Sequence, residues 1–238
     1  MQNNKEEYYN ITKNAKPHLN ILNFLNFNVL PGKAVDLGCG AGRDTIELLK
    51  NNWKVLSIDK EDTESIIREQ LNQKESENFK FEKCFFGEMN LPKVNLIVAN
   101  FSLPFSKKEF FNDIWKNITN SLSNERLFCW KFLWKKDTWA ETKENIIFLT
   151  EQEVKALFSN FELIQFSEIE KDATIASGEK KHWNVYDIIA QKKIFQKTVW
   201  QNYKLCCYIV TLNNVLSFGR CYIVYLYVYC NCTYFFLL

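Results

Sequence analysis

The chain of 238 residues lacks three features, each of which would point to a class of protein. Residues Met1 to Asn14 are polar and charged with no apolar centre, so we expect no signal peptide and predict a cytoplasmic protein. Basic residues are not in excess, because residues 1–193 hold 27 basic and 28 acidic residues, which argues against a nucleic-acid partner. Cys39, Cys84 and Cys129 lie too far apart for a metal knuckle, so we expect reduced thiols and no metal.

The length suits one sizeable core, and apolar strand-like runs alternate with helical stretches. This alternation predicts a Rossmann-like α/β fold with a seven-stranded, mostly parallel sheet and helices on both faces. The last two strands are separated only by residues 171–181, too few for a crossover helix, so the last strand is expected to be antiparallel. Strands are predicted at 33–37, 54–58, 79–86, 94–99, 126–133, 160–168 and 183–191, and helices within 3–27 and at about 43–52, 62–73, 107–123 and 151–159.

Two of the expected helices have a recognisable start. Ser106 with Glu109, and Thr150 with Glu153, have the spacing of capping boxes, in which a hydroxyl and a carboxylate each accept a backbone N–H at the helix start. We therefore predict helices that begin directly after Ser106 and after Thr150.

Residues 34–42, Ala-Val-Asp-Leu-Gly-Cys-Gly-Ala-Gly, combine a short apolar strand, an acidic residue and three alternating glycines. A helical pattern begins directly afterwards, at Arg43. Glycine at every second position lets the backbone adopt conformations closed to other residues and lets a ligand approach the main chain. The stretch predicts a cofactor-binding loop between the first strand and the following helix.

Two classes of cofactor use such a loop, and the spacing of the glycines distinguishes them. A dinucleotide fingerprint reads G-x-G-x-x-G, whereas Arg43 occupies the place of its third glycine here. Asp59 follows a strand-like run and lies where a carboxylate would bind the ribose of either NAD or S-adenosylmethionine. Asp36 would repel a pyrophosphate but suits an ammonium and a sulfonium. The expected cofactor is therefore S-adenosyl-L-methionine.

The stretch from Ala34 to Asp59 resembles motif I and the second strand of class I S-adenosylmethionine-dependent methyltransferases. More narrowly, Gly-Cys-Gly-Ala-Gly-Arg-Asp at 38–44, with Asn-Trp-Lys-Val at 52–55 and Ile-Asp at 58–59, resembles the tellurite-resistance (TehB-like) branch of small-molecule methyltransferases. Similarity continues through 98–105 and 178–185, and it covers roughly residues 8–193. The resemblance implies an enzyme that transfers a methyl group.

The resemblance also assigns site residues. It implies a cofactor site made of Asp36, Gly38, Cys39, Gly40, Gly42, Asp59, Glu88, Met89, Asn100 and Phe101. In this set Asp36 serves the ammonium side, Asp59 the ribose, Glu88 the adenine, and Asn100 with Phe101 the methionine part and the methyl group. Acceptor residues are expected in the N-terminal cap and near the final hairpin: Tyr9, Lys13, His182 and Trp183. Arg43 and Asp44 are expected to be peripheral, because Asp44 can simply favour the positive end of the helix dipole.

Missing motifs narrow the acceptor. Asn100 is followed by Phe-Ser-Leu-Pro-Phe rather than by the Pro-Pro-Tyr of enzymes that methylate amino groups of adenine or glutamine, and no Pro-Cys pair for cytosine C5 chemistry occurs. A small thiol, oxyanion or metalloid such as tellurite or selenite is the expected acceptor. Two alternatives remain open: an NAD-dependent oxidoreductase, and a protein that binds the cofactor without catalysis or serves as a membrane-tethered adaptor.

Residues 194–238 differ in kind from residues 1–193, the expected methyltransferase domain with its N-terminal helical cap. The tail has no acidic residue, holds five of the eight cysteines and is dominated by Tyr, Phe, Val and Leu. Three interpretations compete: a membrane anchor, an extra strand at a sheet edge or dimer interface, and sequence appended by a frameshift or a lost stop codon. The third is favoured, because the resemblance ends near Lys193.

Overall fold

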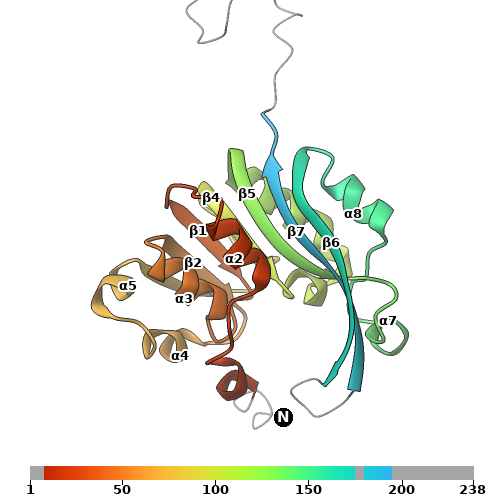
Figure 1. Ribbon diagram of the computed structural model, residues 1–238, viewed down its shortest axis with the longest axis horizontal. Helices are drawn as coiled ribbons and strands as arrows, with labels where there is room; N and C mark the ends of the chain where they lie inside the picture. Colours follow the sequence, from red (N-terminus) through yellow and green to blue (C-terminus); the bar gives the residue numbers. More distant parts are fainter. Residues whose placement is uncertain (1–7, 175–179, 195–238) are drawn as a thin grey trace, which may run out of the picture. The chain divides into compact units, whose positions relative to one another are not determined.

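The computed structural model describes residues 8–174 and 180–194, which lie in one compact unit, Met1–Phe195 (Figure 1). The predictions for residues 195–238 therefore lie outside the described part of the chain. In that part, no helix combines the length and the apolar composition needed to cross a bilayer.

The centre of the fold is one seven-stranded sheet with the order β3-β2-β1-β4-β5-β7-β6 (Figure 1). β1 to β5 run parallel, whereas β7 runs antiparallel between β5 and β6. The predicted α/β class, strand number and antiparallel last strand are confirmed. The strands are β1 Lys33–Leu37, β2 Lys54–Asp59, β3 Phe79–Lys83, β4 Val94–Asn100, β5 Leu122–Leu133, β6 Phe161–Thr174 and β7 Lys180–Lys192.

Helices connect the parallel strands and cover the sheet. Residues 8–12 form a short N-terminal helical segment, so the stretch within 3–27 holds two helical segments in its described part. The other helices are α2 Leu19–Leu25, α3 Arg43–Lys50, α4 Glu64–Arg68, α5 Gln73–Glu77, the 3₁₀ turns η1 Leu103–Phe105 and η2 Lys108–Phe110, α6 Phe111–Ser121, α7 Trp139–Thr142 and α8 Glu151–Leu157.

Both faces of the central strands are buried, as is typical of a parallel sheet. Alternate residues of β4 show this, because Ile97 belongs to one apolar cluster and Leu96 and Val98 belong to the other. The first cluster packs α6 and α8 against the sheet, and the second packs α2, α3 and α4 against the opposite face. The helices thus hold the carboxyl ends of β1, β2 and β4 in a fixed arrangement.

The predicted helix boundaries are partly wrong. The capping box at Thr150 is confirmed, since its hydroxyl accepts the Glu153 N–H and the Glu153 carboxylate accepts the Thr150 N–H. Ser106 caps no helix, because its hydroxyl donates to the Leu103 carbonyl and α6 begins only after a second 3₁₀ turn. The single helix predicted at 62–73 is replaced by α4 and α5, with a new capping box at Asn72.

Candidate cofactor and acceptor site

The glycine loop follows β1 and leads into α3. Gly38, Gly40 and Gly42 have φ angles of +70°, +53° and +85°, in the left-handed region that favours glycine. A Cβ on Gly38 would lie 2.4 Å from Ser102 Cβ, and one on Gly42 would lie 2.7 Å from Ile67 Cγ1. A Cβ on Gly40 would meet only the Tyr9 ring, at 3.8 Å, among the described atoms. A side chain at Gly38 or Gly42 would therefore clash with the protein, whereas one at Gly40 would make an ordinary contact with Tyr9.

Asp59, the last residue of β2, holds this loop. Its Oδ2 accepts the Gly40 N–H at 2.9 Å and its Oδ1 accepts the Glu61 N–H at 3.0 Å. The residue is 8% exposed, so the carboxylate is largely shielded from bulk water. The structure brings Asp59 and the loop together, as their separation in the sequence indicated.

Asp36 lies under the loop. Its Oδ2 accepts the Thr45 hydroxyl at 2.6 Å, and Thr45 Oγ1 lies 2.7 Å from Ser57 Oγ. Burial, together with the negative charge of Asp44, raises the pKa of Asp36 to about 8. The carboxyl group is therefore mostly protonated at neutral pH, whereas the sequence interpretation treated it as a charged carboxylate.

The expectation that Asp44 is peripheral is wrong, because its side chain is buried and joins three hydrogen bonds. The carboxylate accepts the His18 backbone N–H at 2.8 Å, bonds His18 Nδ1 at 2.7 Å and accepts the Asn100 side-chain N–H at 2.8 Å. Asn100 in turn exchanges two hydrogen bonds with the Asn20 amide. Burial would raise the pKa of Asp44, but the His18 charge and these hydrogen bonds hold it below its usual value.

This network ties the N-terminal helices to the carboxyl ends of β1 and β4. The His18 ring also lies 5.4 Å from the Phe101 ring, measured between centroids. Phe101 has φ +53°, a left-handed conformation that is uncommon for a residue with a side chain. The sequence analysis missed His18, although a histidine beside the proline that starts a helix was visible as a signal.

The N-terminal helical segment lies over the glycine loop. Burial raises the pKa of Tyr9, and the Asp59 and Glu61 charges raise it further, which places the Tyr9 hydroxyl near those carboxylates. Tyr8 packs edge-on against Tyr9 with a centroid distance of 5.5 Å. Lys13 forms an ion pair with Glu69 at 2.7 Å. Tyr9 thus lies beside Gly40, and Lys13 is held by Glu69.

Three further predicted cofactor residues differ in their surroundings. Glu88 is exposed, and its N–H donates to the Phe85 carbonyl. Met89 is buried in the apolar cluster under α6, so its side chain packs inside the protein. Cys39 is also buried, which raises the pKa of its thiol well above the usual value. Ser102, not predicted, has a buried hydroxyl with no hydrogen-bond partner among the described residues, next to Gly38.

The final hairpin contributes an aromatic wall. Trp183 packs against Phe101 and Trp139 with centroid distances of 5.6 Å and 5.7 Å. Lys181, ion-paired with the buried Asp137, has its Nζ 3.9 Å from the centre of the Trp183 ring. The wall continues from His18 through Phe101 to these tryptophans.

His182 takes a different direction from Trp183. Its Nδ1 lies 2.8 Å from Asp172 Oδ1 and its Nε2 lies 3.3 Å from Glu170 Oε1, both on β6. The hydrogen bond that His182 donates to Asp172, together with the negative charge of Asp172, raises the pKa of His182. Successive residues of a strand point to opposite faces, so the structure does not bring His182 together with Trp183.

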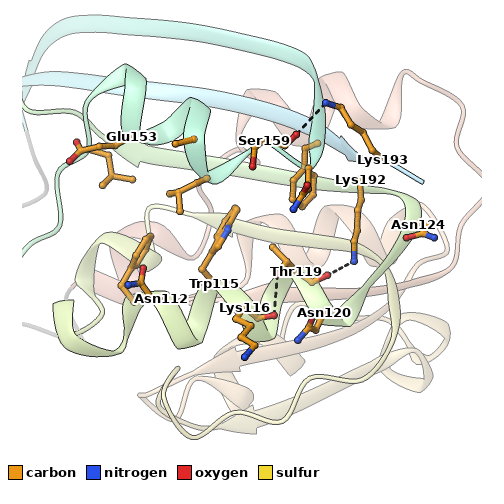
Figure 2. A pocket seen from close by; sticks show the side chains of 16 residues that line it. Asn112, Trp115, Lys116, Thr119, Asn120, Asn124, Glu153, Ser159, Lys192 and Lys193 are labelled. Carbon is orange, nitrogen blue, oxygen red and sulfur yellow. Dashed lines mark hydrogen bonds between the residues drawn. The ribbon is translucent and has the colours of Figure 1, made fainter. Parts of the chain in front are cut away.

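A groove of about 840 Å³ lies between α6 and α8, away from this site. Figure 2 shows Trp115 and Asn112 from α6, Glu153 from α8, and Lys192 at the end of β7 around it. The Lys192 ammonium donates to the Thr119 carbonyl there. Since β7 is antiparallel, its end lies at the opposite sheet edge from the glycine loop. None of the predicted site residues lines the groove.

Comparisons with known proteins agree with this arrangement. A sequence model of the family described as tellurite resistance protein TehB matches residues 1–172. No curated protein sequence matches the chain significantly. TehB from Haemophilus influenzae has a similar structure, with a TM-score of 0.65 and 21% identity over 79% of this chain and 67% of that one.

Two other solved structures share the fold. The 1,6-didemethyltoxoflavin-N1-methyltransferase of Burkholderia thailandensis, with bound S-adenosylhomocysteine, gives a TM-score of 0.56 at 16% identity, over 73% of this chain and 76% of that one. A methyltransferase of Methanosarcina mazei described as S-adenosylmethionine-dependent gives 0.55 at 17% identity, over 71% and 97%. With the family model covering well over half of its length, this chain belongs to the TehB family of class I S-adenosylmethionine-dependent methyltransferases.

Proposed function

We propose that the protein transfers the methyl group of S-adenosylmethionine to a small-molecule acceptor that binds over the carboxyl ends of β1 and β4. The observation that carries the proposal is the loop of three left-handed glycines, whose middle member has only the Tyr9 ring within van der Waals contact of its Cβ position among the described atoms and donates its N–H to the Asp59 carboxylate. β1 and β4 lie next to each other where the strand order reverses, and ligands of open α/β sheets bind at such a point.

The residues around the glycine loop fit the cofactor. Asp59 has the reach to accept hydrogen bonds from ribose hydroxyls, and the Gly38–Gly42 backbone gives the close approach that the methionine part needs. The unpartnered Ser102 hydroxyl supplies a further polar group beside Gly38. We assign Asp36 to the support of the loop, Glu88 and the Met89 backbone to the adenine, and Asn100 with Phe101 to the side of the methyl group.

The chemistry needs little from the protein beyond positioning. The cofactor supplies a methyl group on a cationic sulfur, an electrophile that a nucleophile attacks in line. The Phe101–Trp183 wall and Tyr9 shield and orient the acceptor, and such positioning lowers the barrier by about 7 to 11 kcal/mol in the best intramolecular cases. Aromatic walls favour a polarisable acceptor, which supports a thiol or a chalcogen compound such as tellurite.

The proposal includes the place and extent of the enzyme. The three cysteines in the described residues are free thiols, which supports a reducing, cytoplasmic setting. The last strand of the sheet in the sequence, β7, ends at Lys192, which supports residues 1–193 as the methyltransferase domain. Equal cofactor affinity of the full chain and of a chain ending at Lys193 tests this boundary, and loss of affinity in the shorter chain would refute it.

Calorimetric titration of the full chain with S-adenosylmethionine, S-adenosylhomocysteine and NAD tests the cofactor assignment. We expect binding of the first two. Asp59→Ala should weaken that binding by about 1.5 to 3 kcal/mol, because ribose hydroxyls lose a charged partner. Asp62→Ala removes an exposed carboxylate close by and serves as the matched control, with unchanged affinity. Binding of NAD alone would identify an oxidoreductase instead.

The acceptor is found by incubating the enzyme with labelled S-adenosylmethionine and a panel of thiols, tellurite, selenite and small metabolites. Label transfer to a thiol or chalcogen compound is expected. Transfer to none of them, with intact cofactor binding, would favour a protein that binds the cofactor without catalysis.

A further inference from the structure

We propose that His18, oriented by Asp44, is the base that takes the proton from the methyl acceptor, and that the acceptor is therefore a protonated nucleophile, with a thiol as the chemical class. The inference rests on the proposed function, because it needs the cofactor to bind beside the glycine loop. It assigns a catalytic role to a residue that the sequence analysis did not single out.

The position of His18 is the first observation. Asp44 follows the loop after β1, and Asn100 ends β4, so the His18–Asp44–Asn100 chain spans the point where the strand order reverses. The imidazole also faces Phe101, the first residue of the aromatic wall. His18 thus lies beside Phe101 and is linked through Asp44 to Asn100, the two residues assigned to the side of the methyl group.

The orientation of the ring is the second observation. Nδ1 lies 2.7 Å from the Asp44 carboxylate, and an ionised carboxylate can only accept, so Nδ1 is the donor; in the neutral ring, Nε2 then has the free lone pair. No hydrogen bond within the described residues engages Nε2, and the His18 side chain is 13% exposed. A base whose other nitrogen is fixed by a buried carboxylate is the arrangement that activates nucleophiles in hydrolases.

The charged groups around the His18–Asp44 pair favour the uptake of a proton by His18. Asp44 lies against His18 from α3, and the carboxyl group of Asp36 lies below it on β1. The positive charge of Lys131 on β5 interacts with the negative charge of Asp44, but the Lys131 ammonium forms its ion pair with Asp187 on β7, at 2.6 Å. Arg43 donates to the Lys16 carbonyl. The nearest charge is therefore the Asp44 carboxylate, which stabilises an imidazolium.

The step balances without any further reagent. The S–H proton of the acceptor moves to His18 Nε2 while the sulfur forms a bond to the methyl carbon. The bond between that carbon and the cofactor sulfur breaks, and its electron pair stays on the sulfur, which becomes a neutral thioether. The imidazolium then loses its proton to solvent at the partly exposed edge.

His18→Asn tests the role, because an asparagine amide can still donate to Asp44 from the Nδ1 position. With 2-mercaptoethanol, which is protonated at neutral pH, kcat/KM should fall by about 10² to 10⁴-fold. With 4-nitrothiophenol, which is already ionised, the fall should be small, and cofactor affinity should be unchanged. His182→Asn, which removes the other Nδ1–aspartate pair, is the matched control and should lose little with either thiol.

Three outcomes overturn the inference: equal losses with both thiols, a larger loss in His182→Asn than in His18→Asn, or a wild-type enzyme that methylates neither thiol. If the wild type binds no S-adenosylmethionine, the proposed function fails as well, so the two failures are distinguishable.

A measurement without turnover covers the case in which His18→Asn does not fold. The chain has two histidines, so the His182→Asn protein gives a single imidazole in ¹⁵N-histidine NMR spectra. We expect the neutral His18 ring to carry its proton on Nδ1, with an unprotonated Nε2. A ring protonated on Nε2 alone would contradict the inference.

Discussion

The two histidines of this chain form nearly identical hydrogen bonds in two different regions. His18 Nδ1 lies 2.7 Å from Asp44 in the region around the glycine loop where we propose that the cofactor binds, called the cofactor region below. His182 Nδ1 lies 2.8 Å from Asp172 in the final hairpin. The Asp44 side chain is 3% exposed and the Asp172 side chain 89% exposed. The bond length does not distinguish the pairs. Burial and the further partners of the carboxylate decide which one holds the fold and which one is a surface contact.

Removing the two aspartates should give the largest contrast. Asp44→Ala leaves the His18 N–H groups and the Asn100 amide without their buried acceptor, so we expect the free energy of unfolding to fall by about 3 to 5 kcal/mol. Asp172→Ala should unfold at the same urea concentration as the wild type, because water replaces its carboxylate. Urea titration followed by circular dichroism measures both. Similar losses in the two variants would show that burial is not the deciding factor.

Within the cofactor region, two glycines of the loop should respond differently to substitution by alanine. Gly38→Ala forces a residue with a side chain into the left-handed region and places its Cβ against Ser102. The free energy of unfolding should therefore fall by about 2 to 4 kcal/mol relative to the wild type. Gly40→Ala makes only an ordinary contact with Tyr9, so the free energy of unfolding should fall by about 1 to 2 kcal/mol from the left-handed backbone alone, with a larger loss in cofactor affinity. Thermal unfolding with calorimetry separates the two effects. A Gly40→Ala protein with wild-type cofactor affinity would place the ligand away from the loop.

Asp36 makes the cofactor region respond to pH. Its pKa is raised to about 8 in the folded protein, so its contribution to stability is complete below the ordinary value of 3.8 and is lost as the pH rises through 8. Asp36→Asn keeps an acceptor for Thr45 but cannot ionise. Relative to the wild type, the variant should be more stable at about pH 8.5 than at about pH 5. A constant difference between the variants across this range would contradict the raised pKa.

The hairpin pair should give the smallest effect. The Asp172 hydrogen bond and charge raise the pKa of His182, so any stability from the pair is present at low pH and is lost as the pH rises through that pKa. In Asp172→Asn the pKa of His182 should shift downward, with no measurable change in unfolding. NMR titration of the His182 ring checks the shift. An unchanged pKa would assign the effect to Glu170, the other carboxylate beside the ring.

Much of the fold, including the place of the glycine loop between β1 and α3, could be predicted because the signals are local. The central strands β1, β2 and β4 are short, largely apolar runs, and Gly38 to Gly42 lie within five consecutive positions, so short windows of sequence hold the information. Thr150 and Glu153 are likewise three positions apart.

The rest depended on contacts between distant positions. Asp44 reads as an ordinary acidic residue at a helix start, and only the fold brings it to His18, 26 residues away, and to Asn100, 56 residues away. Ser106 failed as a cap because its hydroxyl bonds the preceding turn instead. Whether Trp183 or His182 faces the site depends on the register of β7 against β5 and β6, which its sequence does not specify.

A crystal structure of the full chain with S-adenosylhomocysteine tests the account most directly. We predict the ribose hydroxyls on Asp59, the homocysteine part along Gly38–Gly42, and the sulfur atom facing Phe101 with His18 Nε2 turned toward the same space. A ligand found in the groove between α6 and α8, or one bound at the loop with His18 turned away from its sulfur, would contradict the account.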